Sequence, residues 1–181
     1  MRQAVCNPAT EVSGQTLQAY IHNVQADVIL PIFEKYGYKD IDPNKWYPLQ
    51  PLLNVLYELG TNVDATTNLV AIGVKIAEYG VEPVETDRAP LHVVLEHWDQ
   101  HMYASIRGSD IGHILTEKLN DKSYRVTHKH LIPDDLCYGL AYGFARSRLP
   151  KGTSFKVEYE DYNHRVDNGN GDKTVILVTW G

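Results

Sequence analysis

The chain has 181 residues, of which 43% are hydrophobic and 22% charged, the composition of one globular domain. Its net charge of −6 argues against nucleic acid as a partner, because phosphate binding needs a basic surface. Its apolar runs are too short for a membrane span, and two distant cysteines, Cys6 and Cys137, are typical of free thiols in a reducing cytoplasm.

The first half of the chain is expected to be helical. A flexible tail is expected over residues 1–14, followed by a single domain over residues 15–181. Apolar side chains at helical spacing predict helices over residues 15–36, 49–59, 65–79 and 90–105. Pro31 should kink or divide the first of these helices. Asp64 is expected to cap the third and Gly80 to end it.

The second half reads as strands around one helix. A first strand is expected over residues 111–119. The next, over residues 123–130, alternates so that one face carries Tyr124, Val126, His128 and His130. Pro133 then opens a helix with the spacing Gly139-x-x-x-Gly143, which allows a close backbone approach. Strands over residues 155–160 and 174–180 follow. The predicted fold is α+β, with N-terminal helices packed on a mainly antiparallel sheet that ends in a βαββ unit.

Amphipathic aromatic residues are frequent, with twelve tyrosines and three tryptophans against three phenylalanines. Such side chains suit a partly wet pocket, although they also lie commonly at the edges of a core. We expect a pocket where the helical half meets the sheet. Its predicted lining is Trp46, Tyr47, Trp98, His101, Tyr103, Tyr138 and Tyr142.

Histidine is the first candidate for metal chemistry. His97 and His101 are four residues apart on a predicted helix, and His128 and His130 share one strand face. If the two pairs converged, four imidazoles could hold zinc, iron or copper. Each pair also occurs as plain polar surface. Haem needs only one axial histidine beside an apolar pocket, which His101 or His92 could supply.

Motifs of catalysis are missing from the sequence, and we assign no catalytic residue. The chain has no phosphate-binding glycine-rich loop, no Gly-x-Ser-x-Gly elbow and no Cys-x-x-Cys pair. Cys137 follows a helix start that would activate its thiol, but Asp134 and Asp135 oppose that effect. Residues 167–172 have the composition of a calcium loop without its closing glutamate, and are interpreted as a hairpin turn.

Four segments in order resemble a group of sensory domains. They cover residues 41–59, 68–78, 102–114 and 131–150, the last followed by two closing strands. Their order is similar to that of uncharacterised bacterial domains related to the vinyl-reductase-like and haem-NO-binding-associated families, which are akin to TRAPP transport subunits. The resemblance implies helices flanking a mainly antiparallel sheet, a frequent homodimer, and signalling partners such as cyclases or kinases. The cysteine metal cluster of vinyl-reductase-like domains is not carried over, because this chain has only two cysteines.

One short match to the haem-NO-binding domains is interpreted as chance. Tyr103, Ser105 and Arg107 have the Tyr-x-Ser-x-Arg spacing with which those domains hold haem propionates. That motif should directly precede a helix and two final strands. Here this place is taken by residues 124–128, which lack the serine and the arginine at the motif's third and fifth positions, so no fixed haem contact is carried over.

Together these observations favour a cytoplasmic small-molecule-sensing or regulatory binding domain, with an aromatic-lined pocket, over an enzyme. Haem is one candidate cofactor, and a divalent transition metal is another. The alternatives are a histidine metal-site protein, a metal-dependent enzyme, and a structural dimerisation module. The expected partners are a small-molecule ligand, a second copy in a homodimer and a signalling protein, with no nucleic acid.

Overall fold

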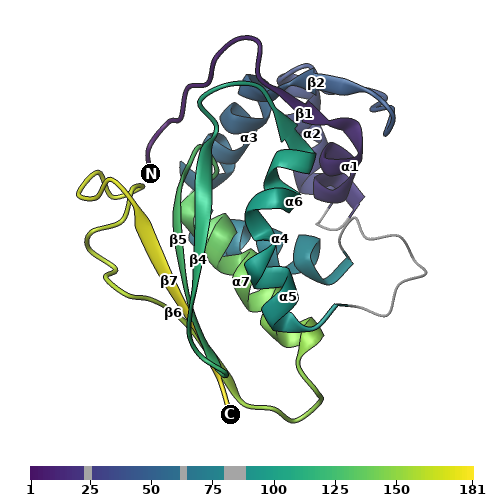
Figure 1. Ribbon diagram of the computed structural model, residues 1–181. Helices are drawn as coiled ribbons and strands as arrows, with labels where there is room; N and C mark the ends of the chain where they lie inside the picture. The colour runs from purple at the N-terminus through teal and green to yellow at the C-terminus, as the bar shows by residue number, and fades with distance from the viewer. Residues whose placement is uncertain (23–25, 62–64, 80–88) are drawn as a thin grey trace.

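A computed structural model describes residues 1–22, 26–61, 65–79 and 89–181 (Figure 1). The helices are α1 Gly14–His22, α2 Ala26–Lys35, α3 Leu49–Thr61, α4 Ala65–Tyr79, α5 Leu91–Glu96, α6 Trp98–Ser105 and α7 Asp134–Arg148. The strands are β1 Glu11–Ser13, β2 Trp46–Pro48, β3 Ile106–Arg107, β4 Gly112–Asn120, β5 Ser123–His130, β6 Phe155–Tyr159 and β7 Thr174–Trp180.

The larger sheet has the order β4-β5-β7-β6, and each of its neighbouring pairs is antiparallel. Helix α7 leads from β5 to β6, and the β6–β7 hairpin then places β7 between those two strands. The predicted α+β fold with a mainly antiparallel sheet and a βαββ end is therefore confirmed. In Figure 1 this sheet forms one side of the molecule and the helices form the other.

Helix α7 lies between the sheet and α4, and glycines set its distance from α4. A Cβ atom built at Gly139 would overlap the carbonyl oxygen of Val70, and one at Gly143 would lie 2.6 Å from the carbonyl oxygen of Val74. Gly73 of α4 is equally close to the backbone of α7. The close approach expected from the glycine spacing is thus made against another helix, because these glycines share the face that α4 covers.

The predicted helix over residues 90–105 is two helices that meet at His97. The ψ angle of His97 is 9°, which ends α5 and starts α6. Its Nδ1 lies 2.9 Å from the carbonyl oxygen of Val93, which also accepts the His97 backbone N–H. The ring therefore competes for a helical acceptor at the break.

The predicted helix over residues 15–36 corresponds to α1 and α2, with Pro31 inside α2. The expected cap at Asp64 and the expected stop at Gly80 lie outside the described residues.

The segment expected as a flexible tail takes part in the fold. Strand β1 pairs with both β2 and β3, and Val12 in its centre is fully buried. Ala4 also belongs to the core, where its carbonyl accepts a hydrogen bond from Gln50. This segment lacks helical periodicity, and its short strand is stabilised only by partners distant in the sequence.

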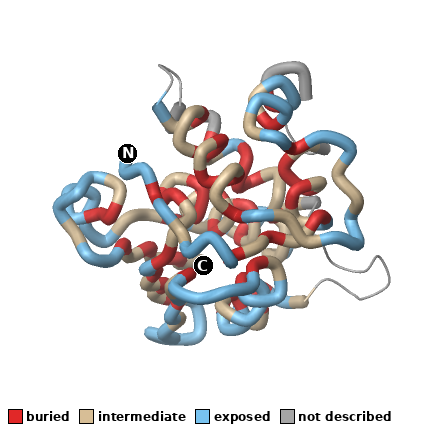
Figure 2. The backbone as a smooth tube through the Cα atoms, turned by 90° about the horizontal axis from the view of Figure 1, so that it is seen from above, coloured by how far each residue is buried: buried red, intermediate tan, exposed pale blue. Residues whose placement is uncertain are grey.

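The core lies between the helices and one face of the sheet, and Figure 2 shows buried residues gathered inside a rim of exposed loops. Strand β5 buries the predicted face of Tyr124, Val126, His128 and His130. Two histidines are thus placed inside the protein beneath the first turn of α7.

Candidate functional site

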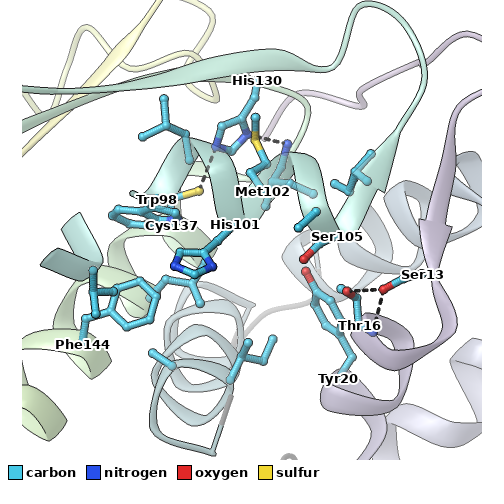
Figure 3. Close-up of a pocket in the computed structure, with 18 of the residues that line it drawn as sticks. Ser13, Thr16, Tyr20, Trp98, His101, Met102, Ser105, His130, Cys137 and Phe144 are labelled. Carbon is cyan, nitrogen blue, oxygen red and sulfur yellow. Dashed lines mark hydrogen bonds between the residues drawn. The ribbon is translucent and has the colours of Figure 1, made fainter. Parts of the chain in front are cut away.

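A cavity of about 340 Å³ lies between the helical half and the sheet, where the sequence predicted a pocket (Figure 3). Helices α1, α4, α5, α6 and α7 contribute to its walls, together with β4 and the end of β5. Among the described residues, its lining consists of Ser13, Gln15, Thr16, Tyr20, Ile76, Ala77, Val94, Trp98, His101, Met102, Ala104, Ser105, Ile106, Ile114, His130, Ile132, Cys137, Leu140, Phe144 and Arg148. Its volume is at the lower end of the range of about 300–1,000 Å³ that small-molecule sites occupy.

The cavity opens to solvent beside His101. Gln15 on α1 and both His101 and Ala104 on α6 are exposed, whereas Trp98 and Met102 on α6 are buried. Helix α6 therefore presents apolar side chains to the interior and an imidazole to the mouth. Figure 3 shows the His101 ring directed into the cavity.

Polar groups gather at one end of the cavity. Ser13 Oγ and Thr16 Oγ1 are hydrogen-bonded at 2.7 Å at the start of α1. The hydroxyl of Tyr20 points toward Ser105 at the end of α6 (Figure 3). Burial raises the pKa of Tyr20, so its hydroxyl stays protonated and can donate a hydrogen bond. This end can therefore hold a polar or anionic part of a ligand.

Two of the seven residues predicted to line the pocket do so, namely Trp98 and His101. Two of the other five, Trp46 and Tyr47, direct their ring or hydroxyl elsewhere. Trp46 lies under the guanidinium of Arg107, with 4.4 Å between the cation and the ring centre. The Tyr47 hydroxyl accepts the backbone N–H of Asp42 at 2.8 Å.

The remaining predicted tyrosines also lie outside the lining. Tyr103 is exposed and donates to the carbonyl of Gly112 at 2.7 Å. Tyr138 donates to the carbonyl of Val157 at 2.9 Å, and Tyr142 packs edge-on against Phe155. These rings lie at the margin of the core, where a backbone carbonyl can satisfy a hydroxyl. Among the described residues, the tyrosine that lines the cavity is Tyr20, which the sequence did not single out.

The Tyr-x-Ser-x-Arg match is dispersed in the structure. Ser105 lines the cavity, but Tyr103 bonds to Gly112 outside it. Arg107 on β3 forms an ion pair with Glu11 at 2.6 Å. The three side chains therefore do not converge on one group, which agrees with the interpretation of this match as chance.

The four histidines of the predicted metal site are not brought together. His97 and His101 are exposed, whereas His128 and His130 are buried. Among the described residues, three potential ligand atoms lie within 4.8 Å of one another, and they belong to His128, His130 and Cys137. The prediction was wrong for His97 and His101, because α7 covers this end of the β5 face and its cysteine, not a histidine of α6, meets the buried pair.

The His130 ring is held in one tautomer by two hydrogen bonds. The backbone N–H of Ile132 donates to Nδ1 at 2.9 Å, so Nδ1 carries the lone pair. The proton of the neutral ring is then on Nε2, which donates to Cys137 Sγ at 3.3 Å. In contrast, His128 Nε2 is buried without a hydrogen-bond partner, and it lies 3.8 Å from Asp134 Oδ1.

Both buried histidines are held neutral. Burial lowers the pKa of His130 to about 4, and the nearby charges of Arg2 and His113 contribute. Burial also lowers the pKa of His128 well below its ordinary value, with contributions from His130 and Arg165. Neutral imidazole is the form that can bind a metal ion.

The Cys137 thiol is also held in its neutral form. Burial raises its pKa well above the ordinary value, and the carboxylates of Asp134, Asp167 and Asp135 raise it further. The expectation that nearby carboxylates oppose activation of this thiol is therefore confirmed. The sequence did carry a signal for this cluster: two histidines on the buried strand face are followed, after one short turn, by a cysteine in the first turn of the next helix.

The loop before β7 is tied to the start of α7. Thr174 Oγ1 donates to Asp134 Oδ1 at 2.9 Å and accepts the backbone N–H of Val166 at 2.9 Å. Burial raises the pKa of Asp134 to about 6, and the neighbouring charge of Asp167 adds to this. The aspartates of this loop and helix thus serve as hydrogen-bond acceptors in a turn.

No protein-family model and no curated protein sequence matches the chain. Solved structures do. An oxygen-binding H-NOX domain related to soluble guanylate cyclases is 12% identical, with a TM-score of 0.67, over 93% of this chain and 94% of that one. A variant of the T. tengcongensis H-NOX is 12% identical, with a TM-score of 0.65, over 93% and 97% of the two chains.

A third solved structure is an H-NOX protein from S. oneidensis in the Fe(II) ligation state, 13% identical with a TM-score of 0.62, over 93% of this chain and 96% of that one. The chain therefore has the H-NOX fold, in agreement with the haem-NO-binding side of the sequence resemblance. Within the described part of the chain, no helix combines the length and hydropathy needed to cross a membrane.

Proposed function

We propose that this protein is a sensory domain that binds haem in the cavity between α1, α6 and α7, with His101 as the ligand of the iron. The observation that supports this most directly is the placement of His101, exposed at the mouth of an apolar cavity and directed into it. Solved structures with the same fold include one that concerns haem redox potential, one that concerns haem distortion, and one of an oxygen complex.

The residues present fit this group. Trp98 and Phe144 pack edge-on at 5.3 Å between ring centres and give the cavity an apolar aromatic wall. His101 would supply an imidazole to hold the haem iron. Ser13 and Thr16 supply hydroxyls for the propionates at the polar end. Haem, when bound, supplies an iron atom that can bind a diatomic gas.

The chain's own residues would make the site a sensor. His101 and Met102 are neighbours on α6, and one lies at the mouth while the other is in the core. A movement of His101, as the ligand of the iron, would therefore move α6, which is joined to α5 through the break at His97. We propose that this movement is passed to a signalling partner, that the protein acts as a cytoplasmic homodimer, and that it shares ancestry with bacterial vinyl-reductase-like and TRAPP-like domains.

Reconstitution with haem tests the proposal. The purified protein is titrated with haemin, and the Soret band of bound haem is followed by absorbance. We expect a saturable band at one haem per chain in the wild type. His101→Ala should shift the band and weaken binding at least tenfold. His92→Ala, at an exposed histidine that does not line the cavity, should leave it unchanged.

Two results would contradict the proposal. A wild-type titration no different from that of free haemin in buffer would remove haem as the ligand. A specific band that His101→Ala leaves unchanged would remove the assigned ligand. Circular dichroism of both variants checks that each is folded before the titrations are compared.

A further inference from the structure

We propose that His128, His130 and Cys137 form a second, independent site that binds a zinc-type divalent ion. The three potential ligand atoms lie within 4.8 Å of one another, and all three residues are buried. They come from the end of β5 and the first turn of α7. Two imidazole nitrogens and one thiolate suit a tetrahedral zinc ion, with a fourth position left for a water molecule.

The observation that indicates an ion is the missing hydrogen-bond partner of His128. Its Nε2 is buried and has no hydrogen-bond partner, although a buried polar atom without a partner is costly. It lies 3.8 Å from Asp134 Oδ1, beyond hydrogen-bond distance. A metal ion between His128 and Cys137 would satisfy this nitrogen.

Coordination changes two protonation states. Cys137 releases its thiol proton to solvent, and the neutral His130 ring keeps one proton, which moves from Nε2 to Nδ1. The backbone N–H of Ile132 then loses its acceptor, because it now donates to Nδ1 at 2.9 Å. Two neutral hydrogen bonds are given up, the one from Ile132 and the one between His130 Nε2 and Cys137 Sγ, and three metal–ligand bonds are gained. The bend at residues 131–132 can absorb the displaced amide.

The cavity provides one route of entry. His130 and Cys137 both line it, and its mouth is open beside His101. His130 also lines a second hollow, beside His113 and Asp172, which gives an ion another approach that avoids the space assigned to haem. The site does not depend on haem binding, and it is tested on haem-free protein.

Cobalt substitution tests the site directly. Haem-free protein is titrated with Co²⁺, and the thiolate-to-cobalt charge-transfer band is followed. We expect one equivalent of Co²⁺ to give the band and Zn²⁺ to bleach it. Cys137→Ser should abolish the band, whereas Cys6→Ser, the matched change at the other cysteine, should retain it. His101→Ala should also retain it, which separates this site from the haem site.

A second measurement separates a metal ligand from a residue that only fills space. His128→Leu removes the unpartnered nitrogen but keeps an apolar side chain of similar size, so the metal-free variant should melt no lower than the wild type. Added Zn²⁺ should raise the melting temperature of the wild type but not of His128→Leu. In ¹⁵N spectra of the wild type, Zn²⁺ should move the His130 proton to Nδ1.

The proposal is overturned if the wild type gives no charge-transfer band, or if the band survives Cys137→Ser and disappears in Cys6→Ser. It is also overturned if Zn²⁺ raises the melting temperatures of the wild type and His128→Leu equally. Circular dichroism of Cys137→Ser distinguishes loss of the ligand from loss of the fold, and an unfolded variant leaves His128→Leu as the deciding protein.

Discussion

Asp134 and Asp167 bond to each other reciprocally: the backbone N–H of each donates to the carboxylate of the other, and both distances are 2.8 Å. The pair connects the first residue of α7 to the loop that leads into β7. It gives the backbone N–H of Asp134, at the start of α7, an acceptor, because Pro133 at the N-cap forms no side-chain hydrogen bond. The first turn of α7 is thereby fixed, with Cys137 held against His130.

The hydroxyl of Thr174 should be critical for this connection. Thr174→Val removes its donation to Asp134 and its acceptance from Val166, and both groups are buried there. We expect a loss of about 1–3 kcal/mol in the free energy of unfolding, because buried polar groups lose their partners. Urea denaturation measures it. Thr127→Val, half-buried on the opposite face of β5, should change stability by less than about 0.5 kcal/mol. Equal effects of the two changes would contradict this role.

The contact between α4 and α7 should tolerate no added methyl group. Gly139→Ala would place a Cβ atom against the carbonyl of Val70. Although alanine is the better helix former by about 1 kcal/mol, overpacking costs about 1–3 kcal/mol, so thermal unfolding should show a lower melting temperature. Gly181→Ala, where a Cβ meets open space, serves as the control. A melting temperature of Gly139→Ala at or above the wild-type value would show that the helices can separate freely.

Acidification should destabilise the protein through His130. Its pKa is about 4 in the folded protein, against about 6.5 in an unfolded chain. Its contribution to the free energy of unfolding is therefore fully present above pH 6.5 and is lost as the pH falls toward 4, because the unfolded chain binds the proton first. The difference corresponds to roughly 3 kcal/mol. Asp134, with a pKa raised to about 6, acts in the opposite direction over this range. Denaturation from pH 7 to 4 should therefore show a steeper loss in the wild type than in His130→Leu. Parallel profiles would contradict the burial of a neutral imidazole.

Filling the mouth of the cavity should block the ligand without harming the core. Ala104 lines the cavity but is exposed, so Ala104→Trp adds a large ring without displacing buried side chains. We expect haem binding, measured by the Soret titration, to weaken at least tenfold, with an unchanged melting temperature. Ala9→Trp, also at an exposed alanine, should bind as the wild type does. Unimpaired binding by Ala104→Trp would place the ligand elsewhere.

Periodicity was enough for elements whose apolar pattern is local. The bounds of α4 and of β5 agree with those predicted, because each buries one regular face. Periodicity failed at His97, where the helix breaks beside a ring-to-backbone bond although the apolar stripe continues. It also failed at β1, which is too short to show a pattern and is paired with β2 and β3. Local patterns therefore located the seam between the helices and the sheet. They did not identify the side chains that line the cavity there, because those come from elements distant in the sequence.

The sequence alone therefore determined the α+β class, the order of the longer elements and the shared face of His128 and His130 on β5. Each of these follows from short-range spacing and from the need to cover an apolar face. Only the tertiary structure decided that His101 and Tyr20 reach the cavity while most predicted tyrosines do not, and that Cys137, not His97 or His101, joins His128 and His130. Which side chains of separate elements meet depends on how each helix is rotated about its axis and on the close contact of α4 with α7. The spacing of residues along the sequence specifies neither the rotation nor the contact.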